Sequence, residues 1–186
     1  ALLMFVATMS AGGKLTLPDI TSGKFAAKTV NGINPIDGTD TYARISQDGE
    51  RVVCCSFKTG KELSVLFDVK NTMGCKIDGF DDYVLSPDGK RMLIQTKTER
   101  IYRRSFKADF YIYNIESRRL DRLSDGDKQQ IPTWSPDGQQ VAFVREGNIF
   151  LVKLLYDNAE IQVTKDGKFN EVINGLPDWV NEEEFG

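Results

Sequence analysis

Histidine is absent from the 186 residues of this chain. The commonest general base and the commonest metal ligand are therefore missing, and no Ser-His-Asp or Cys-His site can be built from this chain alone. An excess of basic charge is also lacking, because 24 Lys and Arg face 27 Asp and Glu, for a net charge of -3. A nucleic-acid partner is not expected, since a phosphate backbone calls for a basic surface.

Cysteine is scarce, and the three thiols of Cys54, Cys55 and Cys75 do not have metal-ligand spacing. Cys54 and Cys55 are neighbours that point to opposite faces of a strand. We predict that all three are core thiols. Neither a metal site nor a cofactor is expected, and no catalytic residue is predicted in this chain.

Long apolar runs are also missing, and the apolar residues 1–11 are too few to span a bilayer. They end in small residues, as the hydrophobic region and cleavage zone of a secretory signal do, although a basic leader is lacking. A buried first strand is the alternative. We expect a signal remnant or N-terminal segment over residues 1–12, one domain over 13–186, and an exported protein, periplasmic or at the cell surface.

A turn tetrad recurs three times, as Ser46-Gln47-Asp48-Gly49, Ser86-Pro87-Asp88-Gly89 and Ser135-Pro136-Asp137-Gly138. Proline presets the second turn position, and Asp-Gly supports the tight reversal with its positive φ. Each tetrad is therefore predicted to join two antiparallel strands.

Short β-rich runs follow each tetrad at similar positions. The expected strands are residues 51–57, 63–69, 91–97, 110–115, 141–145, 149–154 and 160–164. Strands of this length, repeated near the period of a propeller blade, predict an all-β fold of about three four-stranded antiparallel blades. Because a closed ring needs at least four blades, the expected fold is an incomplete β-propeller.

The tetrads are 40 and 49 residues apart, and the extra residues fall in the middle unit. We expect an inserted loop over residues 98–109, which carries Arg100, Arg103, Arg104 and Lys107 between aromatic residues. Such an insertion in a repeat array is where a binding loop is usually found. A solvated basic loop is the alternative.

Three consecutive carboxylates, Glu182, Glu183 and Glu184, follow a turn and Trp179. Three interpretations are open: a solvated face, a Ca²⁺ site that lacks the usual alternating ligand spacing, or a receptor for an organic ammonium group. Trp179 and Phe185 would wall such a receptor. For Trp179 alone, a place in a blade core is the favoured interpretation.

The run Gly175-Leu176-Pro177-Asp178-Trp179-Val180-Asn181-Glu182-Glu183-Glu184-Phe185 resembles the double-glutamate motif of the dipeptidyl peptidase IV family. Tyr102-Arg103-Arg104-Ser105-Phe106, with the strand residues 108–113 after it, resembles that family's arginine loop. The likeness extends from about Leu15 to the end of the chain. Arg104 replaces a histidine often found there, and Asn181 a common tyrosine.

The resemblance implies an eight-bladed propeller followed by a C-terminal α/β-hydrolase domain that carries a serine triad and is missing from this chain. It implies that Glu183 and Glu184 bind the α-ammonium of a peptide with a free N-terminus, that Arg103 binds the first carbonyl oxygen, and that Glu182 is a flanking residue. The full-length protein would be an exported serine peptidase that releases Xaa-Pro or Xaa-Ala dipeptides, and the family pattern allows a homodimer. This chain alone would be inactive. The alternative is a non-catalytic exported propeller module that binds a peptide or protein.

Overall fold

A computed structural model describes residues 15–26 and 32–185 of the chain. The chain divides into two units, residues 1–30 and 31–186. The first contains helix α1, Leu17–Thr21, which begins with a capping box between Thr16 and Asp19. Among the described residues, no helix is long and apolar enough to cross a membrane. The expected signal remnant at residues 1–12 lies outside the described residues.

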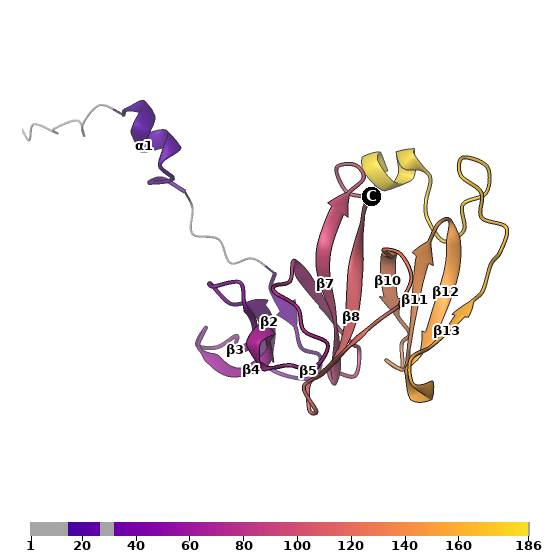
Figure 1. Ribbon diagram of the computed structural model, residues 1–186. Coiled ribbons are helices and arrows are strands. Elements are labelled where there is room, and N and C mark those ends of the chain that lie inside the picture. The colour runs from indigo at the N-terminus through magenta and orange to yellow at the C-terminus, as the bar shows by residue number, and fades with distance from the viewer. Residues whose placement is uncertain (1–14, 27–31, 186) are drawn as a thin grey trace, which may run out of the picture. The chain divides into compact units, whose positions relative to one another are not determined.

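The second unit consists of three β-sheets, as the expected blades require (Figure 1). The first sheet runs in the order β1 (Asn34–Pro35), β2 (Thr41–Ile45), β3 (Arg51–Ser56) and β4 (Glu62–Asp68). The second has the order β5 (Met73–Gly74), β9 (Arg119–Arg122), β8 (Phe106–Asn114), β7 (Arg91–Arg100) and β6 (Asp82–Leu85). The third contains β10 (Gln130–Trp134), β11 (Gln140–Arg145), β12 (Asn148–Lys153) and β13 (Ala159–Gln162).

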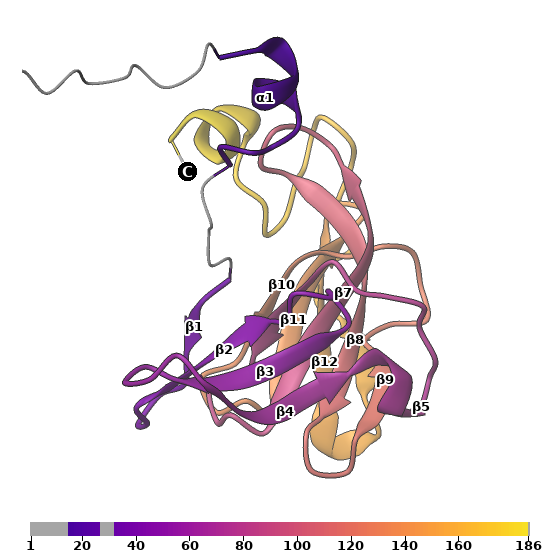
Figure 2. The same ribbon diagram turned by 90° about the vertical axis from the view of Figure 1, so that its left-hand side faces the viewer.

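The second sheet is buried on both faces because it lies between the other two (Figures 1 and 2). Successive residues of a strand point to opposite faces. On β7, Met92 and Ile94 therefore join the core shared with the first sheet, whereas Leu93 joins the core shared with the third. This two-sided burial explains the nearly continuous apolar sequence of β7 and β8. The predicted all-β, incomplete propeller fold is confirmed.

The three tetrads form the predicted hairpin turns, which join β2 to β3, β6 to β7 and β10 to β11. In the second tetrad, the Gly89 amide donates to the Ser86 carbonyl oxygen at 2.9 Å, and Gly89 has a φ of +66°. The Ser86 hydroxyl donates to Asp88 Oδ1 at 2.6 Å and accepts from the Arg91 amide at 2.9 Å. The side chains of Ser86 and Asp88 thus add hydrogen bonds within the turn to those of its backbone.

The aspartates of these turns are expected to make stability depend on acid. In the first tetrad, the hydroxyl of Ser46 and the amide of Glu50 lower the pKa of Asp48 from 3.8 to about 2. A group whose pKa is lowered by folding stabilises the fold above its unfolded pKa and loses that contribution as the pH falls through its folded pKa.

We therefore expect Asp48→Asn to lower the midpoint of thermal unfolding at pH 7, with a difference from the parent chain that shrinks between about pH 4 and pH 2. Thermal unfolding followed by circular dichroism at pH 7 and at pH 2 measures this difference. Asp37→Asn, at an exposed turn outside the tetrads, is the matched control. A difference that is the same at pH 7 and pH 2 would contradict the assignment.

Two details of the blades differ from the prediction. The second sheet has five strands, because the connection that precedes β6 adds β5 in parallel to the outer strand β9. A parallel pair of two residues leaves no periodic signal in the sequence. Cys54 and Cys55 are buried as predicted, whereas Cys75 is only partly buried. It follows β5, where its amide donates to the Leu120 carbonyl oxygen at 2.9 Å.

Candidate functional site

The interruption of the repeat is an extended hairpin and not the long loop predicted over residues 98–109. Strand β7 continues to Arg100 and β8 starts at Phe106, with a bulge after Thr96. Glu99 pairs with Lys107 beyond the bulge, and their side chains form an ion pair at 3.3 Å. The polar residues that suggested a loop therefore belong to two strands that project past the rest of the sheet. Only residues 101–105 form the connecting loop.

The segment before the acidic run is held on the third sheet by Asn174 and Gly175. The Asn174 amide donates to the Gly147 carbonyl oxygen at 2.9 Å, in the turn between β11 and β12. Gly175 has a φ of +76°, and a β-carbon there would lie 2.8 Å from the Val144 side chain. Both the positive φ and the close contact require glycine.

The acidic residues lie on a π-helical turn, Asn181–Phe185, which Asp178 caps. Asp178 Oδ1 accepts from the amides of Val180 and Asn181 at 3.0 and 3.1 Å. The Asn181 side chain donates to Asp178 Oδ2 at 2.5 Å, and this bond is the main reason that the pKa of Asp178 is lowered. The asparagine that departs from the family pattern thus reinforces the cap.

The loop of the long hairpin meets this helical turn, as Figure 1 shows. Glu183 is 2 % exposed, and donors of the loop surround its carboxylate. The amide and the hydroxyl of Ser105 donate to Glu183 Oε1 at 2.9 and 2.7 Å, and the Arg104 amide donates to Oε2 at 2.9 Å. Residues about 80 positions apart in the chain are thereby joined.

Arg103 and Glu184 lie on the accessible side of this contact. Arg103 Nη2 donates to Glu184 Oε1 at 3.1 Å and also to the carbonyl oxygen of Glu183. The side chains of Arg103 and Glu184 are 64 % and 51 % exposed. The structure therefore brings together all three predicted binding residues, and it leaves one cationic and one anionic group open to solvent.

The three glutamates have different environments because successive residues of a helical turn point in different directions. Burial raises the pKa of Glu182, and the charge of Glu183 adds to this effect. Burial would also raise the pKa of Glu183, but the hydrogen bonds from Ser105 and Arg104 and the charge of Arg103 outweigh burial, so that this pKa is lowered. Glu183 is therefore an ionised carboxylate held inside the protein.

Trp179 is 53 % exposed, so the favoured prediction of a blade-core residue is wrong. Its ring contacts that of Tyr102 edge to face, with centroids 6.3 Å apart. Both rings line a hollow of about 770 Å³ together with Glu182. Phe185 is 78 % exposed. Trp179 thus lines a surface hollow, but Arg103, Glu183, Glu184 and Phe185 are not among the residues that line it.

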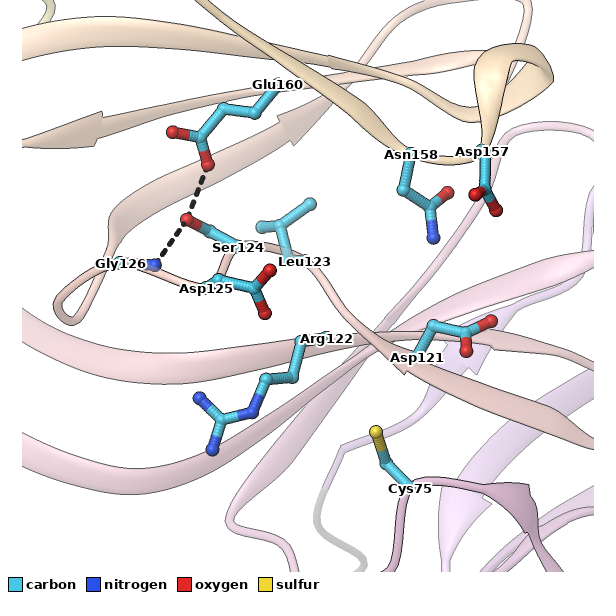
Figure 3. A pocket seen from close by; sticks show the side chains of 10 residues that line it. All are labelled: Cys75, Asp121, Arg122, Leu123, Ser124, Asp125, Gly126, Asp157, Asn158 and Glu160. Carbon is cyan, nitrogen blue, oxygen red and sulfur yellow. Dashed lines mark hydrogen bonds between the residues drawn. The ribbon is translucent and has the colours of Figure 1, made fainter.

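Glu182, Glu183 and Glu184 do not line the second hollow, which has a volume of about 560 Å³. It lies between β9 with the residues after it and the residues at the start of β13 (Figure 3). Ser124 donates to Glu160 at 2.5 Å there, and Arg145 pairs with the same carboxylate at 2.6 Å. Several aspartates also line it, but in the described part of the chain no group of three or more Cys, Asp or Glu is placed to hold a metal ion. Its best-defined contacts therefore hold the connection after β9 against the third sheet.

Comparison with known proteins now decides the family. Residues 86–186 match the family model described as the dipeptidyl peptidase IV (DPP IV) N-terminal region. The chain belongs to the dipeptidyl peptidase IV family. Both the long hairpin and the glutamate turn lie within the matched residues.

Individual members of the dipeptidyl peptidase IV family agree with this. The chain is 34 % identical over 172 residues to prolyl endopeptidase FAP of Homo sapiens, covering 92 % of this chain and 22 % of that protein. It is 33 % identical over 199 residues to the probable dipeptidyl-aminopeptidase B of Tuber melanosporum, covering 96 % and 21 %. The crystal structure of Porphyromonas gingivalis dipeptidyl peptidase 4 superposes with a TM-score of 0.86 at 37 % identity, over 95 % of this chain and 25 % of that one. The chain thus spans about a fifth of the length of the curated relatives it matches.

The sequence indicates the charged residues of the candidate site but not the residue that holds them together. Ser105 stands inside the arginine-loop motif, yet its type and spacing indicated no role. Its function in the fold depends on Glu183, which is 78 residues away in the chain. Only the three-dimensional arrangement shows this contact.

Proposed function

We propose that this chain is the substrate-recognising part of an exported serine-type dipeptidyl peptidase, which releases Xaa-Pro or Xaa-Ala from peptides with a free N-terminus. The family and the names of the relatives support a peptidase. The remaining length of those relatives has room for the hydrolase domain that this histidine-free chain would require. The apolar residues 1–11 support export.

The observation that carries this proposal is the exposed pair of Arg103 and Glu184. A peptide N-terminus presents an α-ammonium, which donates hydrogen bonds. The carbonyl oxygen of the same residue accepts them. A complementary site therefore needs an anionic acceptor beside a hydrogen-bond donor, and a cation is the stronger donor. Arg103 Nη2 and Glu184 Oε1 are 3.1 Å apart, which meets this requirement.

Glu183 and Glu184 would contribute to ammonium binding in different ways. Glu184 offers an accessible carboxylate oxygen for a direct charge-assisted hydrogen bond. Glu183, buried next to it, adds a second negative charge and keeps the arginine loop in place through its three hydrogen bonds. The carboxylates of Glu183 and Glu184 would both attract a bound ammonium, and the guanidinium of Arg103 would oppose this in part.

Such a clamp would determine which peptide bond of the substrate can be cut. Fixing the ammonium and the first carbonyl sets the distance from the start of the peptide to the bond that is cut. The second peptide bond alone would then reach a nucleophile supplied by the rest of the protein. The clamp residues would bind and orient the substrate without taking part in bond cleavage.

Hydrolysis of chromogenic dipeptides by the full-length protein that carries this chain tests the proposal. We expect release of p-nitroaniline from Ala-Pro and Gly-Pro p-nitroanilides and no release from their N-acetylated forms, because acetylation removes the ammonium charge. The 186-residue chain alone, purified in the same way, controls for contaminating peptidases and is expected to be inactive. Equal hydrolysis of free and acetylated substrates would contradict recognition of the N-terminus, and binding without turnover would favour a non-catalytic module.

A further inference from the structure

Ser105 contributes no charge to the clamp, yet it makes two of the three hydrogen bonds that hold Glu183. It is 4 % exposed, and both its amide and its hydroxyl donate to Glu183 Oε1. A hydroxyl that donates to a buried carboxylate stabilises the ionised form of that carboxylate.

The loop that carries Arg103 has other contacts, both within itself and with the glutamate turn. Within the loop, the amides of Ile101 and Tyr102 donate to the Ser105 carbonyl oxygen at 3.0 and 3.3 Å. Its other described contacts with the glutamate turn include the edge-to-face contact of Tyr102 with Trp179, the hydrogen bond of the Arg104 amide, and the bonds of Arg103 to the Glu183 carbonyl oxygen and to the exposed Glu184 carboxylate. Exposed ion pairs fix a geometry weakly. Among the described hydrogen bonds between the loop and Glu183, the two from Ser105 are buried, whereas those from Arg104 and Arg103 are only partly buried.

We propose that Ser105 is a positioning residue of the substrate clamp: its hydroxyl holds the Glu183 carboxylate and thereby places Arg103 beside Glu184 before a substrate binds. The inference rests on the proposed function, because it assigns Ser105 a task in recognising the peptide N-terminus. Ordering the loop in advance lowers the cost of binding, since less freedom is lost when the substrate arrives.

The charges that face Glu183 determine how the loss of this hydroxyl would act. The charge of Arg103 comes from the hairpin loop, which also supplies the backbone amide of Arg104, and the charges of Glu182 and Glu184 come from the helical turn itself. The hydroxyl acts against burial and in the same direction as the Arg104 amide and the charge of Arg103. Its removal is therefore expected to raise the pKa of Glu183, so that the clamp takes up a proton at higher pH.

The test is the pH profile of kcat/KM for Ala-Pro p-nitroanilide in the full-length protein. Ser105→Ala is expected to lower kcat/KM about tenfold at neutral pH, mainly through a higher KM, and to shift the acid limb to higher pH. Ser105→Thr keeps the hydroxyl and should restore both values. Ser105→Cys, a weak donor of similar size, should shift the limb in the same direction and serves if the alanine variant does not fold.

Thr96→Val is the matched control. It removes another buried hydroxyl from the same hairpin, where Thr96 Oγ1 donates to the Asp109 carbonyl oxygen at 3.4 Å. Its acid limb should coincide with that of the parent protein.

Glu184→Gln distinguishes a failure of the positioning role of Ser105 from a failure of the proposed clamp. If Glu184→Gln loses activity while Ser105→Ala keeps the parent kcat/KM, or loses activity equally at every pH, the positioning role is wrong and the proposed function stands. If Glu184→Gln keeps full activity, the clamp itself is wrong and the role of Ser105 falls with it.

Discussion

Replacing Glu184 by glutamine in the full-length protein is expected to lower kcat/KM for Ala-Pro p-nitroanilide about a hundredfold. The exchange keeps the size of the side chain and removes its charge. An ammonium group bound next to Arg103 would then lose its accessible anion, and a half-paired desolvated charge costs about 2 to 5 kcal/mol. The lower half of this range applies because the Glu184 side chain is about half exposed in the free protein.

Glu182→Gln is the control for this result. Glu182 is a neighbour on the same helical turn and undergoes the same chemical change, but it lines the hollow with Trp179 and does not belong to the pair with Arg103. Its loss should cost less than about threefold. Equal activity of the Glu184 and Glu182 variants would show that the charge of Glu184 does not bind the substrate.

Phe67→Ala is expected to lower the free energy of unfolding by about 3 to 5 kcal/mol. Phe67 on β4 is fully buried, and its ring lies edge to face with Tyr113 on β8 and with Phe80, with centroids 4.8 and 5.3 Å away. The substitution would open a cavity where the first sheet packs on the second. Urea unfolding followed by circular dichroism measures the change.

Phe169→Ala is the matched control for this stability measurement. The Phe169 side chain is 89 % exposed, so the same truncation should change the free energy of unfolding by less than about 0.5 kcal/mol. A loss below about 1 kcal/mol for Phe67→Ala would mean that the first two sheets do not share a core, contrary to the stacking of blades.

The blades were predictable because their signals are local. Ser86, Asp88 and Gly89 form a turn from their own side chains and backbone, and the alternation on each strand assigns its residues to two faces. Two strand features were not predictable in this way. The hairpin past Thr96 is exposed and polar, so its sequence resembles that of a loop. Strand β5 has only two residues and a parallel partner, so it shows no periodic pattern.

The site was predictable in its members and not in its arrangement. Arg103, Glu183 and Glu184 were identified from charge and from resemblance to a family motif. That Glu183 is buried while Glu184 is exposed depends on where the hairpin loop meets the helical turn, about 80 residues further along the chain. No pattern within either segment carries this information. Trp179 was misplaced for the same reason, since its partner Tyr102 belongs to the other segment.

The role proposed for Glu184 is recognition of the substrate's α-ammonium. A direct measurement compares the effect of Glu184→Gln on kcat/KM for Ala-Pro p-nitroanilide and for propionyl-Pro p-nitroanilide, which differs only in lacking the amine. This comparison is a double-substitution cycle between the carboxylate and the ammonium. We expect about a hundredfold loss with the amine present and less than about threefold without it. The same loss on both substrates would contradict the claim.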